Sequence, residues 1–221
     1  MTPRGRGADL PGPDVALIRE CLREAGLEWA AAAAEGMAAH AGEMMRWNRA
    51  IRLTAIVDPA AVAVKHVVDS LELLRFAPFP GRLLDFGSGA GYPGIPLALC
   101  LPGTWITLLE ASAKKCAFLS RVRGMLGLRN VQVVHGRVSE RERPSLKPFD
   151  HIVTRATSSP AETVPLLAPY LAEGGRLLLM KGPSDAAEGE IPGEVTRKER
   201  FVLPRGMGER EILEVAPHIS L

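Results

Sequence analysis

Residues 83–96 read LLDFGSGAGYPGIP, and this stretch decides the fold of the chain. A short apolar run ends at Asp85, and glycines then stand at every second position, as Gly87, Gly89 and Gly91, before apolar residues resume. This order predicts a buried strand, a tight glycine turn and a helix. Glycine lets a ligand approach the backbone where a Cβ would block it, and we expect the first N–H groups of the helix to point at the ligand. The pattern therefore predicts a nucleotide-like cofactor at the end of a parallel sheet.

The glycine pattern alone leaves two classes of cofactor open. Residues 89–94, GAGYPG, also satisfy the G-x-G-x-x-G pattern of dinucleotide-binding turns. Glu110 ends the next apolar run, and an acid there can accept hydrogen bonds from ribose hydroxyls in NAD enzymes and in methyltransferases alike. Asp85 separates the two classes, because NAD-binding turns usually stay apolar up to the first glycine. The pattern D-x-G-x-G-x-G resembles motif I of class I S-adenosylmethionine (SAM) methyltransferases, so we favour a methyltransferase over a dehydrogenase.

The composition indicates a globular chain without a strong charge bias. Its 221 residues suit one main domain with an appended element, and a 47% hydrophobic content can supply a sizeable core. Lys and Arg total 27 against 25 Asp and Glu, so a patch that binds nucleic acid must be local. No apolar stretch approaches the roughly 20 residues of a membrane span, and residues 1–14 lack the apolar segment of a signal peptide. We expect a cytoplasmic protein without a membrane partner.

Cysteine and histidine spacing argues against a metal site. Cys21, Cys100 and Cys116 lie far apart, and their odd number without a C-x-x-C pair speaks against a disulfide framework and a zinc site. Each stands in an apolar helical pattern, which favours a buried small hydrophobic residue. The five histidines are scattered and form no H-E-x-x-H motif. We therefore expect no metal.

Hydrophobic periodicity divides the chain into three regions. We expect a flexible N-terminus at residues 1–13, a helical region at 14–80 and the cofactor-binding domain at 81–221. In the last region, apolar runs predict strands at 82–86, 105–109, 131–135, 150–154 and 176–180. Helical stretches between them imply right-handed βαβ units and a parallel sheet. Later runs near 195–203 and 210–216 predict a C-terminal antiparallel hairpin.

The fold class expected is therefore α/β: a Rossmann-like sheet of the class I SAM-methyltransferase type, mostly parallel, preceded by a small helical element. Gly26 is expected to end the first helix, and Asp58-Pro59 to open the third. In the cofactor-binding domain, Val164, Leu167, Ala168 and Leu171 are expected to share one helical face.

Several segments together resemble the RsmG (GidB) family, bacterial methyltransferases that place a methyl group on N7 of one guanine in 16S ribosomal RNA. The resemblance extends from Met45 to Lys181. It is carried by RWNRAIRLTAIVDP, KHVVDSLELL, DFGSGAGYPGIPLAL and TLLEASAKKCAFLSRV, and by the strand ends VVHGRVSE, FDHIVTRA and LLLMKG. The glycine turn with its P-G-I-P tail, the W-N pair and the K-H-x-x-D-S segment make it specific.

This resemblance implies SAM as the cofactor and assigns residues to its pocket. Gly87 and Tyr92 would line the pocket, and Val138 and Ser139 would lie near the adenine. Glu110 would hold the ribose, as its position after the second strand already indicates. The set of expected cofactor contacts is Asp85, Gly87, Gly89, Gly91, Tyr92, Glu110, Val138, Ser139 and Arg155.

Four residues at three places depart from the family pattern. The family usually has Asp where Glu110 stands, and the longer acid can still reach a ribose. It usually has Ala-Glu where Val138-Ser139 stands, so this chain lacks a carboxylate that the family has near the cofactor. The Asn of its I-N-L-T segment is Arg52 here, so no role of that amide carries over.

RNA needs cations for its phosphates, and candidates lie along several segments. Arg155 and Lys181 end two neighbouring strands at the cofactor edge, and we expect them to be catalytic and to contact RNA. Lys65 and His66 are the other expected RNA contacts. For His66 a packed histidine is an equal alternative. Further basic residues lie on helices, where a solvated helix face remains an alternative: Arg46, Arg49, Arg52, Lys114, Lys115, Arg121 and Arg123. For Trp47, a role as a core or interdomain anchor is favoured over base stacking.

Methyl transfer to guanine N7 needs alignment more than proton removal, because N7 has a free lone pair. The sequence offers no obvious general base, which fits that reaction. The expected partner is 16S ribosomal RNA or the small ribosomal subunit, and the protein is expected to be a monomer. Three alternatives stay open: a SAM methyltransferase with another acceptor, an NAD-type oxidoreductase, and a ribosome-assembly factor that binds SAM without turnover.

Overall fold

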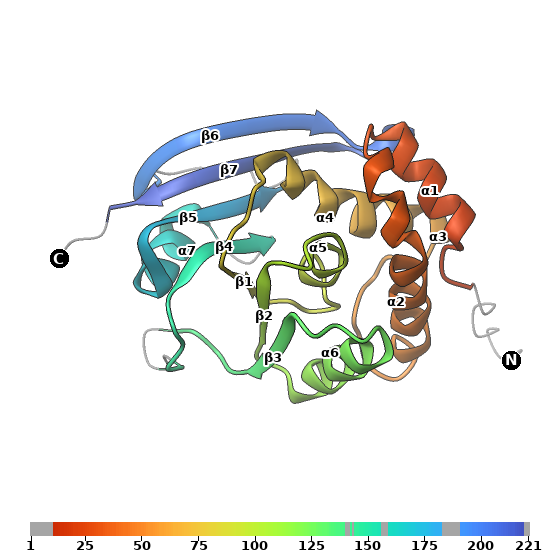
Figure 1. Ribbon diagram of the computed structural model, residues 1–221, viewed down its shortest axis with the longest axis horizontal. Helices are drawn as coiled ribbons and strands as arrows, with labels where there is room; N and C mark the ends of the chain where they lie inside the picture. Colours follow the sequence, from red (N-terminus) through yellow and green to blue (C-terminus); the bar gives the residue numbers. More distant parts are fainter. Residues whose placement is uncertain (1–10, 140–141, 143, 156–158, 183–190, 219–221) are drawn as a thin grey trace, which may run out of the picture.

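A seven-stranded sheet organises the described part of the chain, which a computed structural model places at residues 11–139, 142, 144–155, 159–182 and 191–218 (Figure 1). The strands are β1 (Arg82–Phe86), β2 (Trp105–Glu110), β3 (Val131–His135), β4 (Phe149–Arg155), β5 (Leu171–Lys181), β6 (Gly193–Val202) and β7 (Glu209–Pro217). Their order is β3-β2-β1-β4-β5-β7-β6. β1 to β5 are parallel to one another, and β7 is antiparallel to both β5 and β6.

Helices precede the sheet and connect its strands. The N-terminal ones are α1 (Val15–Glu24), η1 (Glu28–Ala33) and α2 (Ala34–Trp47). One continuous helix follows, made of α3 (Pro59–Val62), η2 (Ala63–Val68), α4 (Asp69–Leu71) and η3 (Glu72–Phe76). The connecting helices are α5 (Gly94–Cys100), α6 (Ala113–Met125), α7 (Pro160–Leu167), η4 (Ala168–Tyr170) and η5 (Pro204–Gly206). Among the described residues, no helix is long and apolar enough to cross a membrane.

The two faces of the sheet bury two different cores. Because side chains alternate along a strand, Leu83 and Val153 face one side and their neighbours Leu84 and Ile152 face the other. The first side packs against α1, α2, α5, α6 and the 59–76 helix. The second packs against α7 through residues such as Val164. Figure 1 shows α5 between the strands and the N-terminal helices.

The N-terminal helices share their core with the sheet. The residues of the larger core run from Ile18 on α1 to Ile212 on β7 without a break in packing. The change from helices to strands falls between Phe76 and Arg82, which agrees in position with the expected division at 80/81. The shared core makes this a change of secondary structure, so a division into two domains remains a proposal. The expected flexible segment 1–13 falls mostly outside the described residues.

The helix boundaries and the strands agree with the residues that predicted them. The Asp58 carboxylate accepts a hydrogen bond from the N–H of Ala61 at 2.8 Å, with Pro59 at the first helical position. Gly26, with φ of 70°, follows the end of α1. The predicted strands and the C-terminal hairpin are present, and the fold class is confirmed.

One helical prediction is wrong. Leu171 does not continue the face of α7, because it is the first residue of β5 and pairs with Phe149. The cause is Pro169, which has no N–H to donate to the preceding turn. The chain tightens into η4 at Ala168 and then becomes extended.

Candidate functional site

The glycine turn follows β1 at the carboxyl edge of the parallel strands. The N–H groups of Gly87 and Ser88 both donate to the carbonyl of Leu109, at 2.9 and 3.1 Å, which fixes the turn to the end of β2. Gly87, Gly89 and Gly91 have φ of 74°, 56° and 86°, in the left-handed region that L-residues with a Cβ rarely adopt. The sequence has glycine at these three positions because the backbone requires it there.

Gly89 and Gly91 nevertheless face different surroundings. Among the described residues, a Cβ on Gly89 would meet only the Gly87 carbonyl, at 3.7 Å, so no described side chain fills the space over this position. A Cβ on Gly91 would come within 2.8 Å of Ile95 and 3.1 Å of the His40 ring. Gly89 is therefore the glycine whose missing side chain leaves room for a ligand, whereas Gly91 allows the turn to pack against α2 and α5.

Asp85 lies buried beneath the turn. One carboxylate oxygen accepts a hydrogen bond from the N–H of Gly94 at 3.0 Å, and the other has no partner among the described atoms. Burial raises the pKa of Asp85 to about 7, against the lowering effect of the Gly94 bond. Asp85 thus links the start of α5 to β1 through one oxygen, and its second oxygen is available to a further hydrogen-bond donor.

The expectation that the first N–H groups of the following helix point at a ligand is wrong. The N–H of Gly94 goes to Asp85, and that of Ile95 goes to the carbonyl of Gly91 at 2.8 Å. Pro96, the next residue, has no N–H. The available surface of the turn is therefore its glycine backbone and not the end of α5.

Glu110 ends β2 beside the turn, as predicted. Its carboxylate accepts hydrogen bonds from the N–H of Gly89 at 2.9 Å and from that of Ser112 at 2.8 Å. The acid therefore braces the open glycine and the start of α6 at the same time.

The next expected contacts follow β3. Val138 is buried in the core on the α7 side of the sheet. The Ser139 hydroxyl accepts a hydrogen bond from the N–H of Glu142 at 3.1 Å, and the Ser139 N–H donates to the Glu142 carbonyl at 2.9 Å. Ser139 thus bonds Glu142 through both its hydroxyl and its N–H, and its role toward adenine remains a prediction.

Tyr92 lies in a stack of three rings behind the turn. Its ring lies between those of His40 and His66, with centroid distances of 4.5 and 4.7 Å, and only 2% of the residue is exposed. Its hydroxyl has no partner among the described atoms, and burial raises its pKa above the usual range. Tyr92 supports the turn from inside, and a contact with the cofactor would be made by its edge or hydroxyl.

Burial keeps both stacking histidines neutral. The Nε2 atom of His40 lies 2.8 Å from the Ala90 carbonyl in the turn, and burial lowers the pKa of His40 to about 4. His66 Nε2 lies 2.9 Å from the Thr54 hydroxyl. Burial, followed by the nearby charge of Arg155, lowers the pKa of His66 to about 3. His66 is thus a packed histidine in this structure, and its contact with RNA remains a prediction.

Arg155 ends β4, next to β5, where Lys181 is the last residue. Its guanidinium donates to the carbonyl of Lys65 at 3.2 Å and lies 3.4 Å from Nδ1 of His66. It also lies 3.8 Å from the carboxylate of Asp69. The structure therefore brings Lys65, His66 and Arg155 into one cluster.

Lys181 is buried at the end of β5, where its register partner on β7 is Glu211. Arg155 is paired in register with Met180, so the two predicted catalytic cations end adjacent strands. Their adjacency confirms the strand arrangement on which the prediction depends. Their contacts with RNA remain predictions.

Sequence reasoning missed Arg210 and His40. Arg210 on β7 lies 3.4 Å from the buried Asp69 carboxylate, although 141 residues separate them in the chain. No local sequence pattern predicts that contact, because it depends on the position of β7 between β5 and β6. His40 lies three residues after Met37 and four before Met44, on the apolar face of α2, and this spacing was the available signal.

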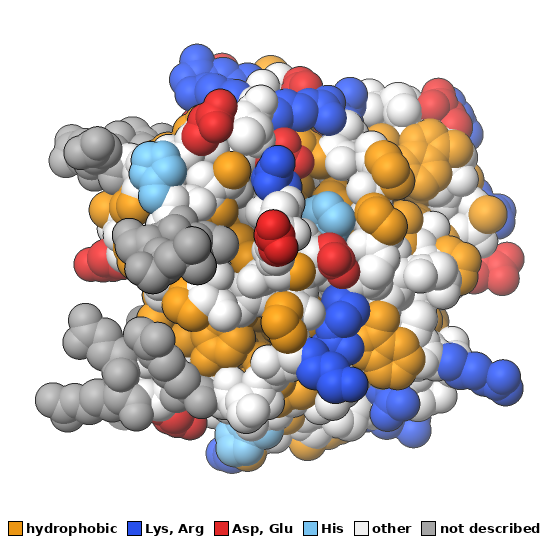
Figure 2. Space-filling model, turned by 60° about the vertical axis from the view of Figure 1, so that its left-hand side comes forward, with side chains coloured by type: hydrophobic (Ala, Val, Ile, Leu, Met, Phe, Trp, Pro, Cys, Tyr) orange, Lys and Arg blue, Asp and Glu red, His pale blue; other side chains and the backbone are white. Residues whose placement is uncertain are grey.

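The basic residues around Trp47 are partly neutralised. Glu43, buried on α2, accepts hydrogen bonds from Arg46, from Trp47 at 3.0 Å and from Arg121 at 3.2 Å. The Trp47 ring also lies 5.7 Å from that of Phe118 on α6. These contacts favour Trp47 as an anchor between α2 and α6. Figure 2 shows a face on which basic side chains form small groups between acidic and apolar ones.

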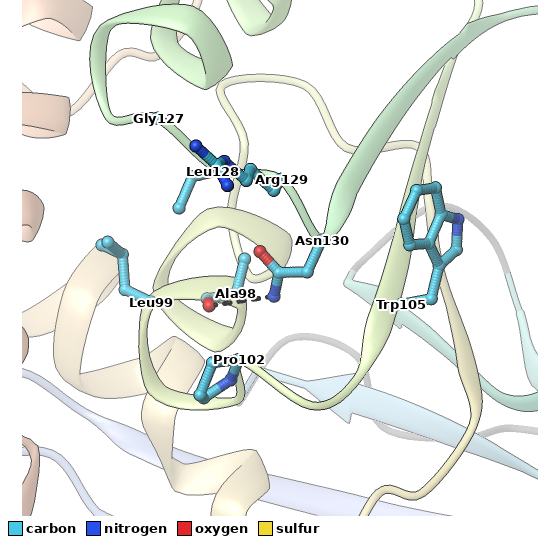
Figure 3. A pocket seen from close by; sticks show the side chains of 8 residues that line it. All are labelled: Ala98, Leu99, Pro102, Trp105, Gly127, Leu128, Arg129 and Asn130. Carbon is cyan, nitrogen blue, oxygen red and sulfur yellow. Dashed lines mark hydrogen bonds between the residues drawn. The ribbon is translucent and has the colours of Figure 1, made fainter.

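A hollow of about 540 Å³ lies at the opposite edge of the sheet, where β2 and β3 begin (Figure 3). It is lined by Ala98, Leu99, Pro102, Trp105, Gly127, Leu128, Arg129 and Asn130. The Asn130 amide fixes its floor by donating to the carbonyls of Ala98 and Leu101, at 3.2 and 3.1 Å. The glycine turn is at the other ends of these strands, so this hollow is separate from the cofactor edge.

The described residues include no group of three or more His, Cys, Asp or Glu placed to hold a metal ion. All three cysteines are free. The absence of a metal from the reaction remains a prediction.

Known proteins identify the family. Residues 33–203 match the family GidB, rRNA small subunit methyltransferase G. The chain belongs to this family. The ribosomal RNA small subunit methyltransferase G of Chromohalobacter salexigens is 40% identical over 197 residues, which cover 88% of this chain and 93% of that protein. The protein of the same name from Neisseria meningitidis serogroup A is 37% identical over 199 residues, covering 89% and 95%.

Solved structures show the same fold at low sequence identity. A SAM dependent methyltransferase from Aquifex aeolicus has a TM-score of 0.54 at 17% identity, covering 72% of this chain and 94% of that one. Precorrin-6y C5,15-methyltransferase from Geobacter metallireducens has a TM-score of 0.50 at 16% identity, covering 76% and 92%. Membership of GidB confirms the predicted family of SAM-dependent rRNA methyltransferases, and these likenesses confirm the fold class.

Proposed function

We propose that this protein transfers a methyl group from SAM to N7 of a guanine in 16S ribosomal RNA. The observation that carries the proposal is the glycine turn, open at Gly89 and braced by Glu110, at the same sheet edge as Arg155. Family membership supplies the class of reaction and of substrate. The base and its atom come from the resemblance and from the chemistry of the site.

The residues of the turn fit a nucleoside cofactor. Gly89 leaves a space that a Cβ would fill, and the Glu110 carboxylate next to it can exchange a backbone N–H for a ribose hydroxyl. Asp85 and Tyr92 each keep one buried polar atom without a described partner. Buried polar groups normally find a partner, so these atoms are places where a ligand or a water molecule would bond. We assign Val138 and Ser139 to the adenine end, after β3.

SAM supplies a methyl group already activated on a sulfonium. The N7 lone pair forms the new C–N bond while the electrons of the S–C bond return to sulfur, so no proton leaves the base. The described groups of the site agree with this chemistry. Glu110 is assigned to backbone N–H donors and the ribose, Asp85 lies beneath the turn, and burial keeps His40 and His66 neutral and enclosed. What remains for the protein is alignment of the two reactants.

Arg155 and Lys181 are the proposed cations on the RNA side. The oxygen O6 of guanine is an acceptor beside N7, whereas adenine carries an amino group there. A guanidinium that donates to O6 would favour guanine and leave N7 free for the methyl group. In an RNA helix N7 lies in a deep, narrow major groove that side chains do not reach, so we expect the target guanine to be unpaired or turned out of its stack. Lys65 and the exposed arginines of α2 and α6 are further candidates for phosphate contacts.

The decisive experiment measures the product. Purified protein is incubated with SAM carrying a labelled methyl group and with small ribosomal subunits, or naked 16S RNA, from cells that lack the gene. Digestion and mass spectrometry should find N7-methylguanine at one site. A label in a protein or small molecule would support a SAM methyltransferase with another acceptor. SAM binding without label transfer to either RNA substrate would support an assembly factor.

We also propose that the protein acts in the cytoplasm, where ribosomal RNA is found, and that it acts as a monomer. The outer strand β6 displays Arg197, Lys198 and Arg200, charges that discourage strand pairing between copies. Light scattering at working concentration should give the mass of one chain.

A further inference from the structure

Asp69 is a buried carboxylate that joins three distant elements near the cofactor edge. It lies on α4 with 3% of its surface exposed. Its oxygens lie 3.8 Å from the Arg155 guanidinium on β4 and 3.4 Å from that of Arg210 on β7. We propose that Asp69, with Arg210, is a positioning residue that holds Arg155 toward the bound substrate; the inference rests on the proposed function, in which Arg155 faces RNA.

The contacts of Arg155 come from one turn of helix. Besides Asp69, the guanidinium contacts the carbonyl of Lys65 and Nδ1 of His66. These residues lie within the wide π-type turn of η2 and directly after it. Such turns are rare and often occur at functional sites. The 59–76 helix therefore presents one surface that orients Arg155.

The charges in this cluster do not cancel. One carboxylate faces two guanidiniums, so the cluster of Asp69, Arg155 and Arg210 has one positive charge in excess. The pairing distances of 3.4–3.8 Å are longer than the usual 2.7–2.9 Å of a charge-assisted hydrogen bond. Asp69 thus directs the guanidiniums without saturating them, and Arg155 keeps donors for an oxygen of the substrate.

Asp69 also needs these cations. Burial raises its pKa, while Arg155 and Arg210 act to lower it. A buried carboxylate without cationic partners is strongly unfavourable, so the three residues depend on one another. Arg210 belongs to β7, which means that the antiparallel part of the sheet takes part in arranging the site.

A matched control stands on the same helix. Glu72 is as deeply buried as Asp69, but its partner is the local Arg75, one turn further on. Asp69→Asn and Glu72→Gln each replace a buried carboxylate by an amide of the same shape. Only the first change removes the group that faces Arg155.

The test is a double-mutant cycle of Asp69→Asn and Arg155→Ala. Single-turnover methyl transfer is measured with RNA and SAM both saturating, beside SAM affinity by calorimetry and the melting temperature. Asp69→Asn should slow transfer about tenfold, Glu72→Gln less than about twofold, and the two melting temperatures should fall alike. In the Arg155→Ala background, Asp69→Asn should change the rate by less than about twofold, because residues that act through one another are not additive.

Equal slowing by Asp69→Asn in both backgrounds would overturn the inference, as would equal slowing by Glu72→Gln. If Asp69→Asn does not fold, Arg210→Lys takes its place in the cycle, because it keeps the charge and alters the geometry. Wild-type protein that labels no RNA would instead overturn the proposed function. Activity of the wild type with an additive cycle overturns only the role of Asp69.

Discussion

Replacing Gly89, Gly91 or Gly127 by alanine should separate ligand binding from stability. All three have positive φ, of 56°, 86° and 63°, so alanine at each costs about 1–2 kcal/mol of unfolding free energy. Within the part of the chain that the structure describes, a Cβ at Gly127 meets nothing within 4 Å and one at Gly89 meets only a carbonyl at 3.7 Å. At Gly91 it approaches Ile95 to 2.8 Å and His40 to 3.1 Å, and such overpacking adds about 1–3 kcal/mol.

Urea unfolding should therefore rank Gly91→Ala as the least stable variant, with Gly89→Ala and Gly127→Ala alike. Calorimetry should rank them differently. Gly89→Ala should weaken SAM binding at least about tenfold, or about 1.4 kcal/mol, because its methyl group occupies the ligand space. Gly127→Ala lies at the end of α6, away from the glycine turn, and should bind SAM as the wild type does. Wild-type SAM affinity in Gly89→Ala would refute the placement of the cofactor over that glycine.

Three further changes test other parts of the site. Glu110→Ala should weaken SAM binding by about 1–3 kcal/mol, the range for a lost hydrogen bond to a charged group, and calorimetry with unchanged affinity would contradict it. Single-turnover methyl transfer at saturating SAM and RNA should be nearly flat from about pH 6.5 to 9, because no general base is required. The pKa of Asp85, about 7, falls within that range, but saturating SAM removes any effect of its titration on cofactor binding, so a tenfold rise in rate per pH unit would contradict the mechanism. His40 has a folded pKa of about 4 against an ordinary 6.5, so the unfolded chain takes up its proton first as the pH falls. As the pH falls from 6.5 to 4, the unfolding free energy of the wild type should decrease by about 1.4 kcal/mol per pH unit more than that of His40→Gln. A constant difference between the two unfolding free energies in urea would refute a neutral, buried His40.

Periodicity and glycine placement were enough to predict the sheet and the turn. The alternation that puts Leu83 and Leu84 on opposite faces is local, and so is the positive φ that selects glycine at 87, 89 and 91. The prediction failed at Leu171, where one proline outweighed an apolar helical pattern. Sequence reasoning placed Asp85 in the binding motif, but it could not show that its carboxylate would take the N–H of Gly94.

The site itself was predictable only in outline. Arg155 and Lys181 follow from strand ends, since the carboxyl ends of parallel strands meet at one edge. The partners of Arg155 could not be read in this way. His66 points inward because it bonds the Thr54 hydroxyl and stacks on the Tyr92 ring. Asp69 contacts Arg210 only because β7 lies between β5 and β6. Contacts over 141 residues depend on topology, which no short pattern encodes.

The hairpin of β6 and β7 has a consequence for biosynthesis. Between its strands, Arg205 is held at φ of 60° and pairs with Glu24 on α1, at 3.0 Å, across 181 residues of sequence. On β7, Arg210 reaches Asp69. A nascent chain cannot make either contact until residues 205–210 have left the exit tunnel. Glu24 on α1 and Asp69 on α4 therefore lack these arginine partners during most of translation. An enzyme proposed to modify ribosomal RNA thus completes its own site only late in its passage through a ribosome.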